Sequence, residues 1–212
     1  MLFRSLVEGD AWVRTGKWPG FAIDQLLGGD VYGKTLGIIG FGRIGQCVGR
    51  RALGFRMRVI YSGANRVPAD VERELNAEFV EQDKLFAEAD FVSLHVPLTP
   101  QTRHLICKGS LEKMKCTAFL INTSRGQVVE EAALVAALEA NKIAGAALDV
   151  FENEPFIHPG LKRSNVVLAP HLASASLETR TKMAVMAANN VVALFTGQLP
   201  PNMLNSAVLK KS

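Results

Sequence analysis

Short apolar runs alternate with helical patterns along most of the chain. The runs are rich in Val, Ile and Leu, and they cover residues 35–41, 58–61, 77–80, 91–96, 118–124, 144–150 and 165–170. Strands that are apolar throughout and separated by helices predict a parallel sheet with helices on both faces. Because crossovers between parallel strands are right-handed, we predict an α/β fold with a doubly wound parallel sheet.

The same pattern divides the chain into three parts. Residues 1–33 contain a short helix, over about residues 2–14, and a Gly-rich arm that leads into the first strand. Residues 34–175 form the predicted sheet domain, and residues 176–212 form a long C-terminal helix and a tail. An apolar stripe on that helix is expected to lie in a core; it consists of Met183, Met186, Ala187, Val191 and Leu194.

Composition and charge exclude several classes of protein. The 24 Lys and Arg residues exceed the 20 Asp and Glu residues, which gives a net charge of +4, but these charges are spread along the chain. They predict no patch for nucleic acid or for a membrane surface. The three cysteines are far apart and lack histidines at metal-ligand spacing, which favours a reducing compartment and no metal site. With no membrane-spanning run and no signal-peptide pattern, we expect a cytoplasmic protein.

A glycine-rich turn follows the first strand and opens a helix. It has the pattern G-x-G-x-x-G, and all six residues are candidate cofactor contacts: Gly40, Phe41, Gly42, Arg43, Ile44 and Gly45. The first glycine permits a tight turn, the second lets the backbone approach a pyrophosphate, and the third lets helix and strand pack closely. Ile44 and Val48 are expected on the inner face of the helix, whose N-terminus favours an anion. The turn predicts a dinucleotide-binding domain of the Rossmann type.

The end of the second strand indicates which dinucleotide is preferred. An acid that binds the ribose hydroxyls of NAD is expected about 20 residues after the glycine turn, but residues 59–66 contain none. A hydroxyl beside a guanidinium would instead accept a 2′-phosphate. We therefore predict a preference for NADP(H) over NAD(H), through Ser62, Asn65 and Arg66. The alternative is that Arg66 is an ordinary surface arginine.

Three polar stretches each follow directly on a predicted strand: residues 122–126, 148–155 and 170–174. The carboxyl ends of parallel strands meet at one edge of the sheet, where ligands bind in such folds. Together with the glycine turn and residues 94–99, these stretches resemble the D-isomer-specific 2-hydroxyacid dehydrogenases.

The resemblance extends over about residues 8–199. Within that family, the chain is most similar to the glyoxylate and hydroxypyruvate reductases. The similarity lies in the neutral loop of residues 61–66, in residues 82–84 and in the helix of residues 177–190.

The resemblance implies a catalytic set of Arg125, Glu154 and His171. Arg125 would bind the carboxylate of a 2-keto acid and polarise its carbonyl, while His171 would protonate the carbonyl oxygen as hydride reaches the carbon. Glu154 would hold the histidine ring in one orientation. Cofactor contacts are also implied for Val96, Pro97, Thr123 and Asp149. Of the other candidates nearby, His95 is expected in the wall of the cofactor cleft, His104 and His158 at the surface, and Glu152 as a bystander.

The expected activity is NADP(H)-dependent reduction of glyoxylate or hydroxypyruvate to the D-2-hydroxy acid, by a homodimer. The resemblance implies that most of the family's substrate lobe lies outside this sequence, so we expect turnover by the chain alone to be impaired. Two alternatives remain open. One is an NAD(P)H-sensing binding protein of the corepressor type, and the other is a catalytically incompetent fragment that retains cofactor binding.

Overall fold

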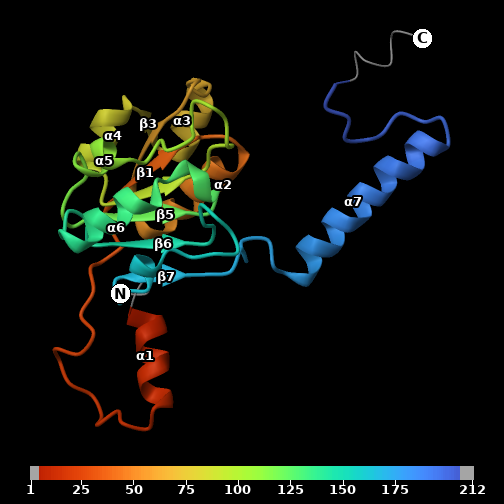
Figure 1. The fold of residues 1–212 in the computed structure, drawn as a ribbon. Helices are drawn as coiled ribbons and strands as arrows, with labels where there is room; N and C mark the ends of the chain where they lie inside the picture. Colours follow the sequence, from red (N-terminus) through yellow and green to blue (C-terminus); the bar gives the residue numbers. More distant parts are fainter. Residues whose placement is uncertain (1–4, 206–212) are drawn as a thin grey trace. The chain divides into compact units, whose positions relative to one another are not determined.

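The computed structural model describes residues 5–205, and the chain divides into two compact units after His171. The first unit contains a seven-stranded sheet in the order β3-β2-β1-β4-β5-β6-β7, with every neighbouring pair parallel (Figure 1). The strands are β1 Thr35–Ile39, β2 Arg58–Ser62, β3 Ala77–Phe79, β4 Phe91–Leu94, β5 Phe119–Asn122, β6 Gly145–Leu148 and β7 Val166–Leu168. The order reverses between β1 and β4, which confirms the predicted doubly wound sheet.

The register aligns the carboxyl ends of six strands. Ile39 pairs with Ser62 on one side and Leu94 on the other, and the row continues through Asn122 and Leu148 to the end of β7. The residues that follow these strands therefore start from one line across the sheet. The glycine turn, the first two polar stretches, and Pro170 and His171 of the third follow the ends of these strands.

Helices cover both faces of the sheet. The α-helices of this part are α2 Arg43–Ala52, α3 Ala69–Leu75, α4 Gln82–Glu88, α5 Lys108–Leu111 and α6 Glu131–Glu139. Side chains of α2 and α3 share one core cluster with Ile38, while α4, α5 and α6 share another with Ile39. Because adjacent strand residues point to opposite faces, strands that are apolar throughout supply both cores.

The helix after the glycine turn differs in one respect from the prediction. Its buried residues are Gly45, Gly49 and Ala52, and Val48 is partly buried, whereas Ile44 is 67% exposed. The expectation that Ile44 lies on the inner face is therefore wrong. Small residues at i, i+4 and i+7 bring the helix axis close to the sheet, and Ile44 lies outside that row.

Single-turn 3-10 helices complete the first unit: η1 Leu53–Phe55, η2 Gly126–Val128 and η3 Pro159–Leu161. The N-terminal helix α1 spans Ser5–Arg14. Its predicted start at residue 2 and the tail beyond residue 205 lie outside the described residues.

The second unit contains the helix α7, Leu177–Phe195, which begins where the sequence predicts. Ser176 caps it, since its Oγ accepts a hydrogen bond from Thr179 N at 3.1 Å. Met183, Val191 and Leu194 are each more than half exposed, so the stripe predicted to lie in a core is not buried by the described residues of this unit. Between residues 5 and 205, no helix is both long and apolar enough to cross a membrane.

Candidate active site

In the glycine turn after β1, two of the three glycines have close neighbours and the third faces open space. Gly40 has φ +91°, and a Cβ there would lie 2.8 Å from the His95 carbonyl. A Cβ on Gly45 would lie 2.4 Å from the Gly40 oxygen, so the helix packs directly on the turn. A Cβ on Gly42, by contrast, would meet nothing within 4 Å. Of these three glycines, only Gly42 therefore has room for a ligand beside it.

The start of α2 suits an anion at that open position. Gly42 is the N-cap, it provides no side-chain hydrogen bond, and the first turn contains no acid. A helix N-terminus without a cap or a carboxylate presents backbone N–H groups and the positive end of its dipole. The turn therefore fits the pyrophosphate of a dinucleotide.

The end of β2 lies beside the turn. The Ser62 carbonyl accepts a hydrogen bond from Gly40 N at 2.9 Å, and Ser62 is buried. Arg66 is exposed but paired: its Nε and one terminal nitrogen bond the two carboxylate oxygens of Glu72 at 2.9 and 2.8 Å. The buried Tyr61 hydroxyl also donates to Glu72, at 2.7 Å. These hydrogen bonds, from Arg66 first and then Tyr61, lower the pKa of Glu72.

Sequence reasoning missed Glu72 because it lies on α3 and not on the loop after β2. Its place on α3 could have pointed to Glu72, because this helix directly follows the loop that carries Arg66. The pair orients the Arg66 guanidinium and also offsets part of its charge.

The remaining candidate cofactor residues follow β4, β5 and β6 along the same edge. Val96 is partly buried against Gly40, Pro97 and Thr123 are exposed, and Asp149 is buried. His95 Nε2 lies 2.9 Å from Ser93 Oγ, and burial lowers the pKa of its imidazole. The His95 backbone lies next to the turn, since its carbonyl is the near neighbour of Gly40.

A buried amide shapes the loop that presents Arg125. Asn122, at the end of β5, is fully buried. Its Oδ1 accepts from Ser124 N and Oγ at 3.0 and 2.9 Å, and its Nδ2 donates to the Arg125 carbonyl at 3.0 Å. The Arg125 guanidinium is exposed and donates to the Ser124 carbonyl at 2.6 Å. Asn122 thus fixes the backbone on both sides of the arginine.

The next residue, Gly126, lets this loop touch the loop after β6. A Cβ there would lie 1.8 Å from the Phe151 carbonyl oxygen. Any larger residue would push the two loops apart. The contact brings the Arg125 loop against the segment that carries Glu154.

Glu154 and His171 are in direct contact. His171 Nδ1 lies 3.2 Å from Glu154 Oε2, and Phe151 N donates to Glu154 Oε1 at 3.0 Å. The Phe151 N–H, the His171 ring and the Arg125 charge together lower the pKa of the Glu154 carboxyl below its usual value of 4.5. His171 has φ +55°, and its N–H donates to the Asp149 carbonyl at 2.9 Å. The structure thus brings together the three residues that the resemblance implied.

This arrangement suits proton transfer at the surface of a small cavity. The cavity has a volume of about 200 Å³ and is lined by Phe151, Glu154, Pro155, Ile157, Pro170 and His171. With Nδ1 directed at a carboxylate, the imidazole is held in one orientation, and Nε2 is the nitrogen left to exchange a proton with a ligand.

Two neighbouring residues outside the implied catalytic set bond each other. The Glu152 side chain, expected as a bystander, bonds the His104 ring and the first turn of α6. The His104 side chain, expected at the surface, is 36% exposed. His158 is exposed, as predicted, and its Nδ1 accepts from Gly160 N at 3.1 Å. Nothing in the local pattern marked His104 and Glu152 as partners, since they are 48 residues apart.

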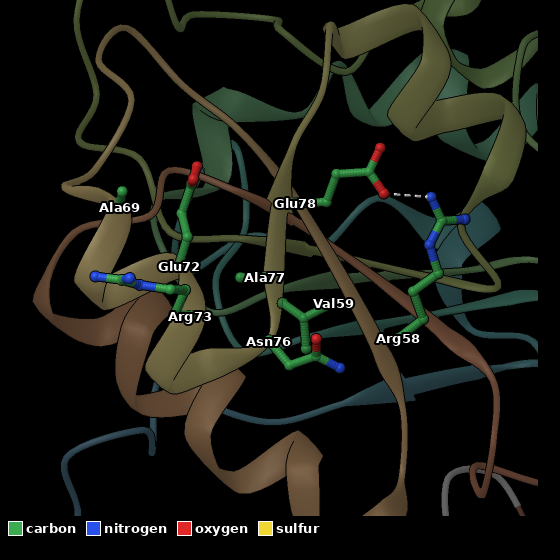
Figure 2. Close-up of a pocket in the computed structure, with 8 residues that line it drawn as sticks. All are labelled: Arg58, Val59, Ala69, Glu72, Arg73, Asn76, Ala77 and Glu78. Atoms are coloured by element: carbon green, nitrogen blue, oxygen red, sulfur yellow. Dashed lines mark hydrogen bonds and ion pairs between the residues drawn. The ribbon is translucent and has the colours of Figure 1, made fainter.

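A larger cavity, of about 670 Å³, lies elsewhere, between α3 and the strands β2 and β3 (Figure 2). It extends to the start of both strands, away from the edge that carries His171. Arg58 and Glu78 point toward each other across it, and their ion pair measures 2.7 Å. Arg58 also bonds Glu88 at 2.7 Å, so its charge is neutralised within the protein.

The family pattern described as "D-isomer specific 2-hydroxyacid dehydrogenase, NAD binding domain" matches residues 1–173. Relatives include the glyoxylate reductase of Korarchaeum cryptofilum, which is 54% identical over 210 residues, covering 98% of this chain and 63% of that protein. The glyoxylate reductase of Thermococcus litoralis is 50% identical over 214 residues, covering 99% and 64%. The chain thus spans less than two thirds of these relatives.

Solved structures show the same fold. A glyoxylate reductase from Paecilomyes thermophila is 40% identical, with a TM-score of 0.84, covering 92% of this chain and 59% of that one. The apo D-lactate dehydrogenase of Escherichia coli is 34% identical, with a TM-score of 0.83, covering 96% and 64%. On the sequence match and the shared fold, the chain belongs to the D-isomer-specific 2-hydroxyacid dehydrogenase family and contains its domain for the nicotinamide cofactor.

Proposed function

We propose that this chain provides the cofactor-binding and acid–base residues of a reductase for small 2-keto acids. The substrate would be glyoxylate or hydroxypyruvate, and a chiral product would have the D configuration. The observation that carries the proposal is the 3.2 Å contact between Glu154 and His171, at the same sheet edge as the open glycine turn. The names of the relatives support this substrate class.

The proposed chemistry divides between three side chains. Arg125 holds the substrate carboxylate through charge-assisted hydrogen bonds and polarises the adjacent carbonyl. The nicotinamide cofactor, when bound, would provide the hydride for the carbonyl carbon. His171 gives its proton to the carbonyl oxygen, so the C=O bond becomes C–H and O–H. Glu154 orients the ring and stabilises the imidazolium before transfer.

We propose NADP(H) as the preferred cofactor. Ser62 and Asn65 would bond the 2′-phosphate, and Arg66 would meet its charge. The ion pair with Glu72 orients the Arg66 guanidinium, which favours binding of a 2′-phosphate. The carboxylate also lowers the positive potential near Arg66, which weakens the attraction of that phosphate. NAD(H) would then bind less tightly but by the same turn. The proposal also includes a homodimer acting in the cytoplasm.

The test is turnover by the purified chain with hydroxypyruvate or glyoxylate, followed as loss of NADPH absorbance, with NADH in parallel. We expect oxidation of NADPH to exceed that of NADH. Arg66→Ala should raise KM for NADPH roughly tenfold or more and leave KM for NADH unchanged, since it removes a hydrogen bond to a charged group. Arg73→Ala, on α3, is the matched control.

The two negative outcomes test the cofactor preference and the reductase activity separately. Equal use of NADH and NADPH would contradict the cofactor preference alone. Tight NADPH binding without turnover of either keto acid would contradict the proposed activity for this chain and favour the fragment or corepressor interpretation.

A further inference from the structure

A polar cluster behind the Glu154 loop joins three loops at the sheet edge. His104, in the loop after β4, places its Nε2 2.5 Å from Glu152 Oε1. The other carboxylate oxygen, Glu152 Oε2, accepts from Glu131 N at 3.1 Å, while Glu152 N donates to Glu131 Oε1 at 2.7 Å. Gln127 Nε2 donates to the Glu152 carbonyl at 2.8 Å. The backbone and carboxylate of Glu152 are therefore both tied to segments distant in sequence.

The carboxylate of Glu152 takes the place of a helix cap. The N-cap residue of α6, Glu130, makes no capping hydrogen bond with its own side chain. Glu152 supplies the acceptor for the first turn from the neighbouring loop, and its negative charge lies at the positive end of the helix dipole. Glu131 is only 4% exposed, so the reciprocal bond lies largely out of water, where a lost partner is costly.

This cluster lies close to the candidate active site along the chain, because Glu152 is two residues before Glu154. Phe151 N donates to Glu154 Oε1, and the Phe151 carbonyl lies against Gly126, next to Arg125. Glu152 follows Phe151 directly. The peptide that joins Phe151 to Glu152 contains both the carbonyl that lies against Gly126 and the N–H that bonds Glu131. A shift of this peptide would displace Phe151, whose own N–H bonds the Glu154 carboxylate.

We propose that Glu152, clasped by His104 and Glu131, is a positioning residue that aims the Glu154 carboxylate at His171. The effect of Glu152 on turnover rests on the proposed function, whereas its effect on the position of the Glu154 carboxylate does not. The hydrogen bonds of Glu152 with His104 and Glu131, here called the clasp, hold residues 151–154 against the Arg125 loop. Glu154, His171 and Arg125 then keep one geometry before substrate binds.

The first readout is the carboxyl titration of Glu154, followed by NMR in the whole chain. Glu152→Ala removes both side-chain bonds, so we expect the pKa of Glu154 to rise toward its usual value as the Phe151 N–H and His171 lose alignment. Glu152→Gln retains an acceptor for Glu131 N and a group that can bond the His104 ring, so it should restore the wild-type titration. Glu130→Ala is the matched control and should change nothing.

The second readout is turnover. Glu152→Ala should lower kcat by about tenfold or more through misplacement of the acid–base pair, with KM for NADPH unchanged because the glycine turn is untouched. If the wild-type chain shows no turnover, the proposed function fails while the titration still tests the clasp.

His104→Ala removes one bond and keeps the contacts with α6, so it provides the same test if Glu152→Ala does not fold. It should shift the titration of Glu154 in the same direction by a smaller amount. A wild-type titration of Glu154 in every folded variant of His104 and Glu152 would overturn the proposal.

Discussion

His171 owes its position to its backbone as well as to its side chain. A residue other than glycine pays a steric penalty at φ +55°, and here the Asp149 carbonyl holds the His171 N–H in place. Histidine is also the side chain whose ordinary ionisation lies nearest neutral pH. Backbone and side chain together leave the imidazole at the cavity and against Glu154.

Replacing His171 should separate chemistry from cofactor binding. His171→Gln keeps a polar side chain but cannot exchange a proton near neutral pH, so we expect turnover to fall by about 10²- to 10⁴-fold. The affinity for NADPH, measured by quenching of protein fluorescence, should change little. Full activity in this variant would show that another residue is the acid.

The lowered pKa of Glu154 makes stability depend on pH in a defined direction. The pKa of this carboxyl is lower in the folded chain than its usual 4.5. Its contribution to stability is therefore present above about pH 4.5 and lost as pH falls through the lowered folded value. Urea unfolding at pH 7 and at pH 3 should show a smaller loss for Glu154→Gln than for the wild type; an equal loss would contradict the assignment.

Among elements, the glycine turn and α2 are held by the ends of β2 and β4, through the Ser62 and His95 carbonyls. Gly40 and Gly45 are required by contacts inside the protein, whereas Gly42 borders open space and has an ordinary φ of −77°. Folding and cofactor binding therefore place different demands on the three glycines.

This difference predicts a variant that folds but does not bind. Gly42→Ala adds a Cβ that meets no protein atom within 4 Å but occupies the approach to a pyrophosphate. We expect the thermal midpoint without ligand to stay near that of the wild type and the Kd for NADPH to rise by tenfold or more. Gly54→Ala, whose Cβ also meets nothing within 4 Å, is the control, and equal NADPH affinity in both variants would count against the turn as the phosphate site.

At the level of the whole molecule, the cofactor should act as a stabiliser of the first unit. A ligand that binds only the folded state at 100 times its Kd adds about 2.7 kcal/mol of stability. Calorimetry with increasing NADPH should show a rising transition midpoint for the wild type and a much smaller rise for Gly42→Ala. A midpoint independent of NADPH would argue against binding by the isolated chain.

The chain covers 63–64% of the length of its glyoxylate reductase relatives. In the proposed function, an exposed arginine and a small cavity at the sheet edge would bind a keto acid, but exclusion of water and orientation of the substrate require a surface facing them. For this reason cofactor binding and turnover are expected to respond separately in His171→Gln.

The sequence by itself determined the elements, the class of sheet and the edge where the site lies. Apolar periodicity and glycine spacing act over a few residues, so the strands, the turn and the long helix from Ser176 could be predicted directly. The motifs that follow the strands also predicted one edge for Arg125, Glu154 and His171, and the strand register aligns the ends of β5, β6 and β7.

Only the tertiary structure decided which side chains meet behind that edge. Glu152 bonds His104 and Glu131, which are 48 and 21 residues away, and Glu72 reaches Arg66 from α3. Ile44 was misplaced because Gly45, Gly49 and Ala52 set how closely α2 approaches the sheet. Such contacts depend on strand order, register and helix approach, which are set by packing of the whole chain and leave no period in the local sequence.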